Sequence, residues 1–134
     1  MGAGVLIVED QVLIAIHLQD LVEEAGHRVS AIAHDTATAV NAAARQRPAF
    51  AIMDLRLANG SHGLDAAQQL YEKFGVRCIF VSANIDEDVR SKAAAYESLG
   101  YIGKPFLAAE VITAVQAAAR ATGPVIAPDP YGSS

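Results

Sequence analysis

The sequence contains a single cysteine, Cys78, so the chain by itself cannot form a disulfide. Cys78 lies within the apolar run of residues 76–82, where we predict a buried structural thiol rather than a nucleophile. No apolar run reaches the length that spans a membrane. The first residues, Met-Gly-Ala-Gly-Val, lack the basic segment of a signal peptide. We therefore expect a cytoplasmic protein without membrane association.

Basic residues are also scarce. The chain has 10 lysines and arginines against 15 aspartates and glutamates, which gives a net charge of −5. A basic face is required for binding nucleic acid through its phosphates, so direct nucleic-acid binding is disfavoured, as is direct binding to anionic lipid. In contrast, 52% of the 134 residues are hydrophobic. This content is sufficient for one domain with a core and argues against disorder.

Short apolar runs alternate with amphipathic helical patterns along the chain. We predict strands at residues 5–8, 28–33, 50–53, 77–81 and 100–102, and helices at 12–25, 36–45, 63–74, 86–96 and 107–121. Asn59-Gly60 marks a turn in the loop of residues 55–62. This alternation predicts an α/β domain over residues 1–121, with a parallel sheet covered by helices on both faces. Residues 122–134, rich in proline and glycine, are predicted to form a flexible tail.

Polar side chains lie at the carboxyl ends of four of the predicted strands. Glu9 and Asp10 follow the first, Asp54 the third, Ser82 the fourth and Lys104 the fifth. The carboxyl ends of parallel strands meet at one edge of a sheet, where such folds bind ligands. Three carboxylates there would repel one another, and they suit a hard cation such as Mg²⁺. With a lysine ammonium and a serine hydroxyl opposite, the set forms a cradle for a phosphoryl group on one carboxylate.

Four sequence blocks carry a family resemblance: VLIVED, AIMDLRL, CIFVSAN and GYIGKPF. They resemble, in order and spacing, the signature blocks of the receiver domain of two-component response regulators. The resemblance covers residues 5–120. It implies a flavodoxin-like (βα)5 fold, a doubly wound parallel sheet with strand order 2-1-3-4-5. The receiver would be either of the stand-alone, single-domain type or part of a longer chain.

The resemblance also implies roles for individual residues. Asp54 matches the phosphoacceptor, and Glu9, Asp10, Asp54 and the backbone carbonyl of Arg56 match the ligands of Mg²⁺, for which Mn²⁺ substitutes. Ser82 and Lys104 match the phosphoryl-binding residues, and Tyr101 matches the switch aromatic. Pro105 matches the proline of a cis peptide bond, here Lys104–Pro105. Arg56 and Asn84 match the positions that tune phosphoryl lifetime. Glu9 and Ser82 depart from the commonest residues of the family, aspartate and threonine, and are familiar variants.

The function implied is a phosphorylation-dependent signalling switch. Asp54 would accept a phosphoryl group from a histidine kinase or a histidine phosphotransfer protein. The surface formed by the fourth helix, fifth strand and fifth helix would then change its binding to a downstream protein or to a second copy of the chain. The only catalysis implied is of the protein's own phosphoryl acceptance and slow autodephosphorylation, so it is not an enzyme in the usual sense.

Three alternative functions fit these residues less well. A haloacid-dehalogenase-like phosphatase has a second aspartate two residues after its nucleophile, where this chain has Arg56, which cannot act as a general acid. A flavodoxin-like electron carrier needs a phosphate-binding loop after the first strand, and Glu9-Asp10 would repel a flavin phosphate. A docking module that does not switch is the third, and the retained set of chemical residues argues against it.

Each of these residues also has an ordinary structural explanation when taken singly. Asp54 suits a loop or cap residue at a strand end, and Ser82 suits a helix cap. Acidic residues such as Glu9 and Asp10 suit the first turn of a helix. Lys104 suits a solvated surface. Their coincidence at the ends of four strands is what favours a functional site. The histidines lack metal-ligand spacing and are predicted to lie at the surface or in loops.

Overall fold

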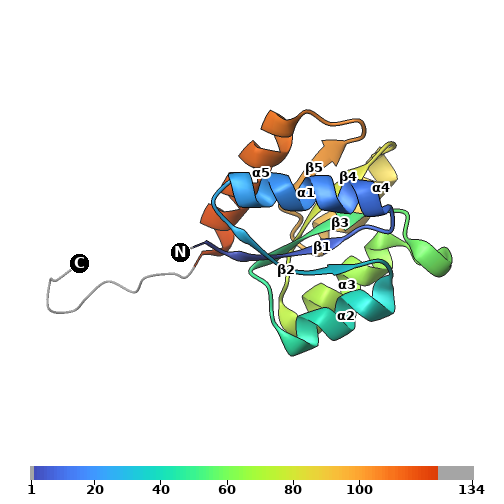
Figure 1. Cartoon of the computed structure of the whole chain (residues 1–134). Helices are drawn as coiled ribbons and strands as arrows, with labels where there is room; N and C mark the ends of the chain where they lie inside the picture. Colours follow the sequence, from blue (N-terminus) through green and yellow to red (C-terminus); the bar gives the residue numbers. More distant parts are fainter. Residues whose placement is uncertain (1, 124–134) are drawn as a thin grey trace, which may run out of the picture.

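A five-stranded parallel sheet forms the middle layer of the protein in a computed structural model that describes residues 2–123 (Figure 1). The strand order is β2-β1-β3-β4-β5, as predicted. The strands are β1 (Gly4–Val8), β2 (Arg28–Ala33), β3 (Phe50–Asp54), β4 (Cys78–Ser82) and β5 (Gly100–Gly103). The helices are α1 (Val12–Glu24), α2 (Thr36–Arg45), α3 (Gly63–Phe74), α4 (Glu87–Ala94) and α5 (Ala108–Thr122), with a 3-10 turn, η1, at Ala58–Gly60.

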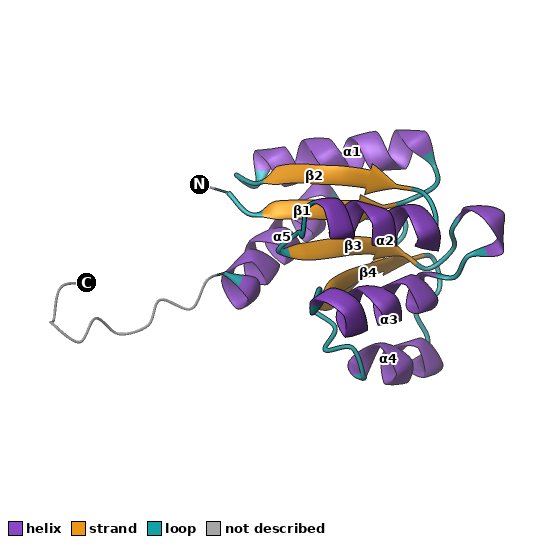
Figure 2. Cartoon of the chain, turned by 90° about the horizontal axis from the view of Figure 1, so that it is seen from below, coloured by secondary structure: helices purple, strands orange, loops and turns teal. Residues whose placement is uncertain are grey.

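Helices cover both faces of the sheet, so the core has two layers. Helices α1 and α5 pack on one face, and α2, α3 and α4 lie on the other (Figures 1 and 2). Successive strand residues point to opposite faces, so Leu6 and Met53 belong to the α2–α3 layer while Ile7 and Ile52 belong to the α1–α5 layer. Because β1, β3 and β4 are buried on both faces, they read in the sequence as continuous apolar runs.

The largest departure from the predicted elements is at the end of α4. The helix ends at Ala94 rather than at residue 96. The chain turns there through Glu97, whose φ of 52° is left-handed. This turn lets the Leu99 amide donate to the Cys78 carbonyl at 2.8 Å, which starts the pairing of β5 with β4. Helix α4 is therefore short because the following strand must begin within a few residues.

At the C-terminal end, α5 extends to Thr122, one residue beyond the predicted domain boundary. The rest of the predicted flexible tail, from residue 124 onward, lies outside the described residues. Among residues 2–123, no helix has the length and apolar character needed to cross a membrane.

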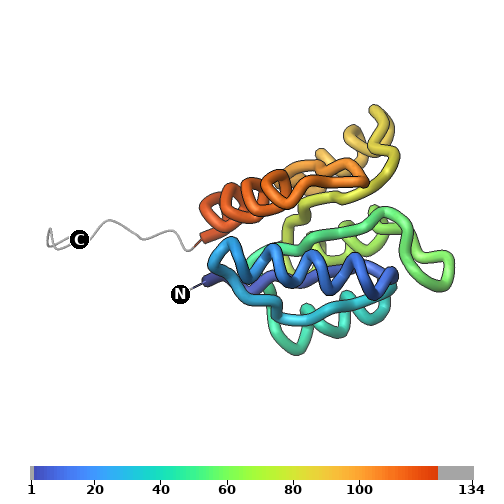
Figure 3. Tube along the Cα trace, turned by 45° about the horizontal axis from the view of Figure 1, so that its top comes forward, coloured from blue at the N-terminus to red at the C-terminus, as the bar shows by residue number. Residues whose placement is uncertain are grey.

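The carboxyl ends of all five strands lie at one edge of the sheet, as parallel pairing requires. The loop between β3 and α3, which contains η1, extends beyond this edge (green in Figure 3). This loop, together with the segments that follow β1, β4 and β5, surrounds the candidate site.

Candidate functional site

Three carboxyl groups gather at the ends of β1 and β3. Glu9 and Asp10 follow β1, and Asp54 ends β3, which pairs with β1 through Val8 and Met53. One oxygen of each carboxylate lies within 4.8 Å of an oxygen of both others. Glu9 and Asp54 are 2% and 5% exposed, whereas Asp10 is exposed. The structure thus brings together the three acidic residues that the sequence placed at this edge.

Lys104 reaches the acidic cluster from the segment after β5. Its Nζ lies 2.7 Å from Glu9 Oε1 and 3.0 Å from Asp54 Oδ2. The Lys104 backbone amide donates to the Ser82 carbonyl at 2.9 Å, which fixes the base of the side chain beside β4. Burial lowers the pKa of Lys104, but the hydrogen bonds to Glu9 and Asp54 outweigh burial and raise it above its usual value. The ammonium is therefore charged and shared between two buried carboxyl groups.

Glu9 has a perturbed pKa. Burial and the neighbouring Asp54 raise the pKa of Glu9 to about 7, against the opposing hydrogen bonds from Lys104 and from the Gln11 amide. The cluster sets three carboxyl groups against one ammonium. Clustered carboxylate oxygens with a surplus of negative charge are the donor set that hard divalent cations prefer. The residues present therefore fit Mg²⁺.

The loop after Asp54 contacts the Asp54 carboxylate directly. The Arg56 amide donates to Asp54 Oδ1 at 3.2 Å, so both oxygens of Asp54 have a hydrogen-bond donor. The loop returns to the strand at Gly63, whose position leaves no room for a side chain. A Cβ there would lie 2.1 Å from the Asp54 carbonyl oxygen and 2.8 Å from Leu55 Cα. Gly63 is therefore required for α3 to start against the strand end.

A cavity of about 400 Å³ opens beside Asp54 and Lys104. Its walls include Gln11, Arg56, His62, Ser82 and Asn84. The Ser82 hydroxyl accepts a hydrogen bond from the Asn84 amide at 3.2 Å, and it can rotate to donate into the cavity. The cavity is open enough to admit a phosphoryl group and holds donors on two sides.

Tyr101 lies outside this cavity. Its ring stacks on Phe80, with 6.1 Å between ring centroids, and the Arg90 guanidinium lies 4.4 Å from the Tyr101 centroid. The hydroxyl donates to the Arg90 carbonyl at 3.5 Å. Tyr101 therefore packs between β4 and α4 on the surface side of β5. The Lys104–Pro105 peptide bond is cis.

Sequence analysis missed several residues that shape the site. Gln11 and His62 line the cavity, and His62 caps α3 by accepting the Leu64 amide at Nδ1. A polar network of Asp35, Thr38 and Asn59 was also missed. Asp35 and Thr38 have the spacing of a helix-capping pair, which was a signal available in the sequence.

Comparisons with known proteins identify the family of this chain. The family model for the response regulator receiver domain matches residues 5–116. The phyllosphere-induced regulator PhyR of Methylorubrum extorquens is 37% identical over 119 residues, covering 88% of this chain and 44% of PhyR. The transcriptional regulatory protein PdtaR of Mycobacterium tuberculosis is 30% identical over 114 residues, covering 85% of this chain and 55% of PdtaR. The chain thus spans about half the length of these relatives.

Solved structures give the same family. The receiver domain of PhyR from Erythrobacter litoralis, determined by solution NMR, is 31% identical with a TM-score of 0.78, over 94% of this chain and 96% of that one. The signal receiver domain of a diguanylate cyclase from Desulfovibrio desulfuricans is 28% identical with a TM-score of 0.80, over 91% and 97% of the two chains. This chain belongs to the response regulator receiver domain family of two-component signalling.

Proposed function

We propose that Asp54 accepts a phosphoryl group and that the protein is a phosphorylation-dependent switch. The observation that supports this most directly is the setting of Asp54. Its carboxylate is buried between the Lys104 ammonium and the Arg56 amide, beside two further carboxyl groups, and it faces a cavity of about 400 Å³. A buried carboxylate held in this way is positioned as a nucleophile with charge compensation already present.

In the proposed reaction, an Asp54 oxygen attacks the phosphorus of a phosphohistidine on a kinase or a histidine phosphotransfer protein. An O–P bond forms, the P–N bond breaks, and the leaving imidazole nitrogen takes up a proton. Lys104 then shifts from the carboxylate to a phosphoryl oxygen, and the Ser82 hydroxyl donates to another. Arg56 and Asn84 line the cavity and would influence how fast water reaches the acyl phosphate, so they are proposed to set its lifetime.

Glu9, Asp10, Asp54 and the Arg56 carbonyl are proposed to hold Mg²⁺, with Mn²⁺ as a substitute. When bound, the ion would neutralise charge on the transferring phosphoryl group. The chain's own residues supply the nucleophile, the ammonium and the hydroxyl. No turnover of other substrates is proposed beyond slow hydrolysis of the protein's own acyl phosphate.

The output of the switch is proposed at the face of α4, β5 and α5. Movement of Ser82 toward the phosphoryl group would change the space beside β5, and the Tyr101 ring could leave its stack on Phe80 to occupy it. The change in shape would alter binding of a downstream protein or of a second copy. This requires two conformations within a few kcal/mol of each other, biased by a new charge. We further propose that the protein acts in the cytoplasm and that residues 1–121 form the receiver domain.

An apolar surface beside the acidic cluster suits docking of the phosphodonor protein. Val12, Leu13 and Ile16 are exposed on the first turns of α1, with Leu13 82% exposed. Leu107, on the segment after Lys104, is 70% exposed. Val12 and Ile16 line a cavity together with Glu9 and Asp10. We propose that a donor delivering a phosphoryl group to Asp54 covers these exposed side chains.

A haloacid-dehalogenase-like phosphatase is disfavoured because Arg56 stands where the general acid would be. A docking module that needs no phosphorylation is the remaining alternative. Incubation with acetyl phosphate and Mg²⁺, followed by intact mass measurement, tests the proposal. We expect one phosphoryl group on the native protein and none on Asp54→Asn, because an amide is a poor nucleophile. Equal labelling of both would refute the assignment of Asp54, and labelling of neither would favour the docking module.

A further inference from the structure

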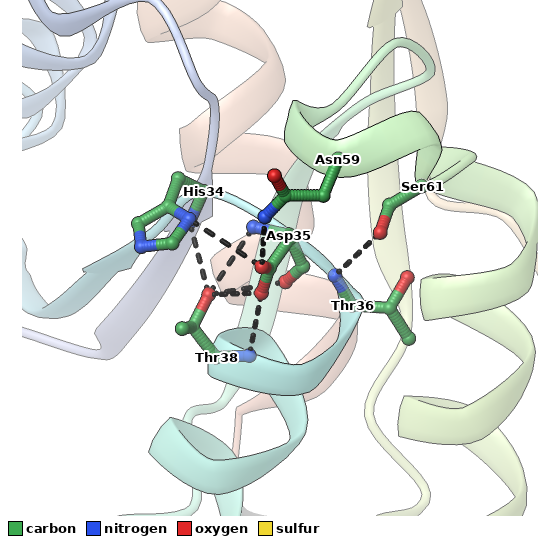
Figure 4. Close-up of polar contacts among 6 residues, drawn as sticks. All are labelled: His34, Asp35, Thr36, Thr38, Asn59 and Ser61. Carbon is green, nitrogen blue, oxygen red and sulfur yellow. Dashed lines mark hydrogen bonds and ion pairs between the residues drawn. The ribbon is translucent and has the colours of Figure 1, made fainter.

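A polar network links the loop after β2 to the loop after β3 (Figure 4). Asp35 is its centre and the N-cap of α2. Asp35 Oδ1 accepts from the Thr38 amide at 2.8 Å and from the Thr38 hydroxyl at 2.7 Å. Asp35 Oδ2 accepts from Asn59 Nδ2 at 3.2 Å. The carboxylate therefore caps its own helix with one oxygen and holds the neighbouring loop with the other.

Two further contacts join the same loops. The Ala58 amide donates to the His34 carbonyl at 3.0 Å, and the Thr36 amide donates to Ser61 Oγ at 3.4 Å. Asn59 itself has a left-handed φ of 59°, a conformation that asparagine tolerates better than most residues. The tip of the β3–α3 loop is thus attached at three points to the start of α2.

The other end of this loop contacts the acidic cluster. Arg56, whose amide donates to Asp54 Oδ1, forms an antiparallel bridge with His62, and the Leu57 amide donates to the Ser61 carbonyl at 3.1 Å. These contacts therefore join the two arms of the loop to each other. A displacement of its tip would be transmitted to the amide that holds Asp54. Asn59 and His34 also line one cavity with Glu9 and Asp10, which places the network beside the acidic pair.

We propose that Asp35, Thr38 and Asn59 are positioning residues for the acidic cluster: by fixing the tip of the β3–α3 loop, they keep the Arg56 backbone in register with Asp54. The effect on Mg²⁺ binding and phosphoryl acceptance rests on the proposed function of Asp54. A helix cap alone does not explain the network, because capping α2 uses only Oδ1. The Thr38 amide, the Thr38 hydroxyl and Asn59 hold the pKa of Asp35 below its usual value, so the contact with Asn59 is made by a carboxylate.

The test compares three variants with the native chain. Asn59→Asp keeps the shape of the side chain but sets two carboxylates against each other. Asn59→Gly removes the donor while retaining a residue that adopts positive φ. The double exchange Asp35→Asn/Asn59→Asp reverses donor and acceptor, restores the hydrogen bond and leaves the net charge unchanged. Asn41→Asp, on the exposed side of α2, is the matched control for added charge.

The readouts are the Mg²⁺ affinity by calorimetry, the amide NMR signal of Arg56, and the melting temperature. We expect Asn59→Asp to weaken Mg²⁺ binding by about three- to tenfold, below the range for residues that contact metal ligands directly. Asn59→Gly should weaken it less. Added negative charge alone would strengthen Mg²⁺ binding, so weakening cannot arise from charge. The double exchange should restore affinity to within about twofold of the native chain, and the Arg56 signal should move and return in parallel.

A merely structural role would lower the melting temperature of Asn59→Asp while leaving the Mg²⁺ affinity of the folded protein and the Arg56 signal unchanged, and this result would overturn the proposal. Lack of rescue by the double exchange would also overturn it. The two proposals can fail separately. If Asp54→Asn is still labelled by acetyl phosphate, the proposed function fails, whereas the Arg56 signal tests the loop alone.

Discussion

Lys104 lies nearer to Glu9 than to Asp54, with its Nζ at 2.7 Å from the Glu9 carboxylate and 3.0 Å from the Asp54 carboxylate. The contact with Glu9 spans 95 positions in the sequence and joins the two outermost segments of the site. Glu9 thus has two roles, since it orients the ammonium that faces Asp54 and contributes charge to the acidic cluster. The balance between these roles depends on whether Glu9 is ionised.

The first prediction concerns pH. In the absence of divalent cations, the contribution of Glu9 to stability should be fully present below its unfolded pKa of about 4.5 and lost as pH rises through about 7, because the folded state holds the proton more tightly. We expect the free energy of unfolding to fall by on the order of 2 kcal/mol from this group. Urea unfolding at pH 5.0 and 7.5 in EDTA measures it. The decline should be smaller in Glu9→Gln, and parallel profiles would contradict the prediction.

The second prediction concerns Asp10, the exposed carboxylate of the cluster. Asp10→Asn removes like-charge repulsion with Glu9 and Asp54, so metal-free stability should rise by about 0.5 kcal/mol. The same change removes a proposed ligand, so Mg²⁺ affinity should fall at least about tenfold. Calorimetry and urea unfolding check both effects. Asp20→Asn, on the exposed face of α1, is the control and should change neither quantity appreciably. Undiminished Mg²⁺ binding would remove Asp10 from the site.

The third prediction concerns Gly63. Gly63→Ala would place a Cβ against the Asp54 carbonyl oxygen, and this backbone atom cannot rotate away. We expect a loss of about 3 kcal/mol in the free energy of unfolding and a displaced Arg56 amide signal. Gly103→Ala is the matched control, because a Cβ there meets no atom within 4 Å. Equal stability of the two variants would show that α3 can shift without cost.

The fourth prediction separates docking from chemistry. Leu13→Ser removes an exposed apolar side chain from the proposed donor-docking surface without touching the acidic cluster. Labelling by acetyl phosphate should be unchanged, whereas transfer from the cognate phosphodonor protein should slow by about tenfold, equivalent to about 1.4 kcal/mol of lost contact. Leu107→Ser should behave in the same way. Unchanged transfer in both variants would place the donor elsewhere.

The fifth prediction concerns the switch. Addition of beryllofluoride, a phosphoryl mimic, with Mg²⁺ should shift amide NMR signals around Asp54 and also those of residues 84–106. In Lys104→Ala the signals near Asp54 should still shift, whereas those of residues 84–106 should not. The variant lacks the ammonium that would pair with the phosphoryl oxygens and so link them to the segment after β5. If residues 84–106 stay unchanged in the native chain, the protein binds the mimic without switching.

Much of the architecture follows from sequence pattern because buried parallel strands need continuous apolar runs, and the end of each strand is marked by a polar residue. The clustering of Glu9, Asp10 and Asp54 follows from strand order alone. The partners of Lys104 do not, because the choice between two carboxylates depends on distances of tenths of an ångström. The helical pattern of the sequence also predicted α4 to end at residue 96 rather than at Ala94, because no residue type among 95–97 indicates the turn at Glu97.

The polar network around Asp35 shows a second limit of prediction from the sequence. The spacing of Asp35 and Thr38 indicates a cap for α2, and that part could be derived from the sequence. The contact of Asp35 with Asn59, 24 positions away, depends on how two loops meet above the sheet. Similarly, Tyr101 is recognisable as a sheet residue, but its stacking on Phe80 follows from the register of β4 with β5.

The pairing of Lys104 with Glu9 and Asp54 has a consequence during biosynthesis. The site draws its parts from β1, β3 and the segment after β5, so a ribosome must synthesise most of the chain before the ammonium can meet the carboxylates. A truncated copy, or one in which β5 has detached, would carry Asp54, the proposed acceptor, without its counter-charge. Such copies would still present Asp54 to a phosphoryl donor but, like Lys104→Ala, would not pass the change on to residues 84–106. Damaged protein would therefore be silent in the signalling pathway rather than wrongly active.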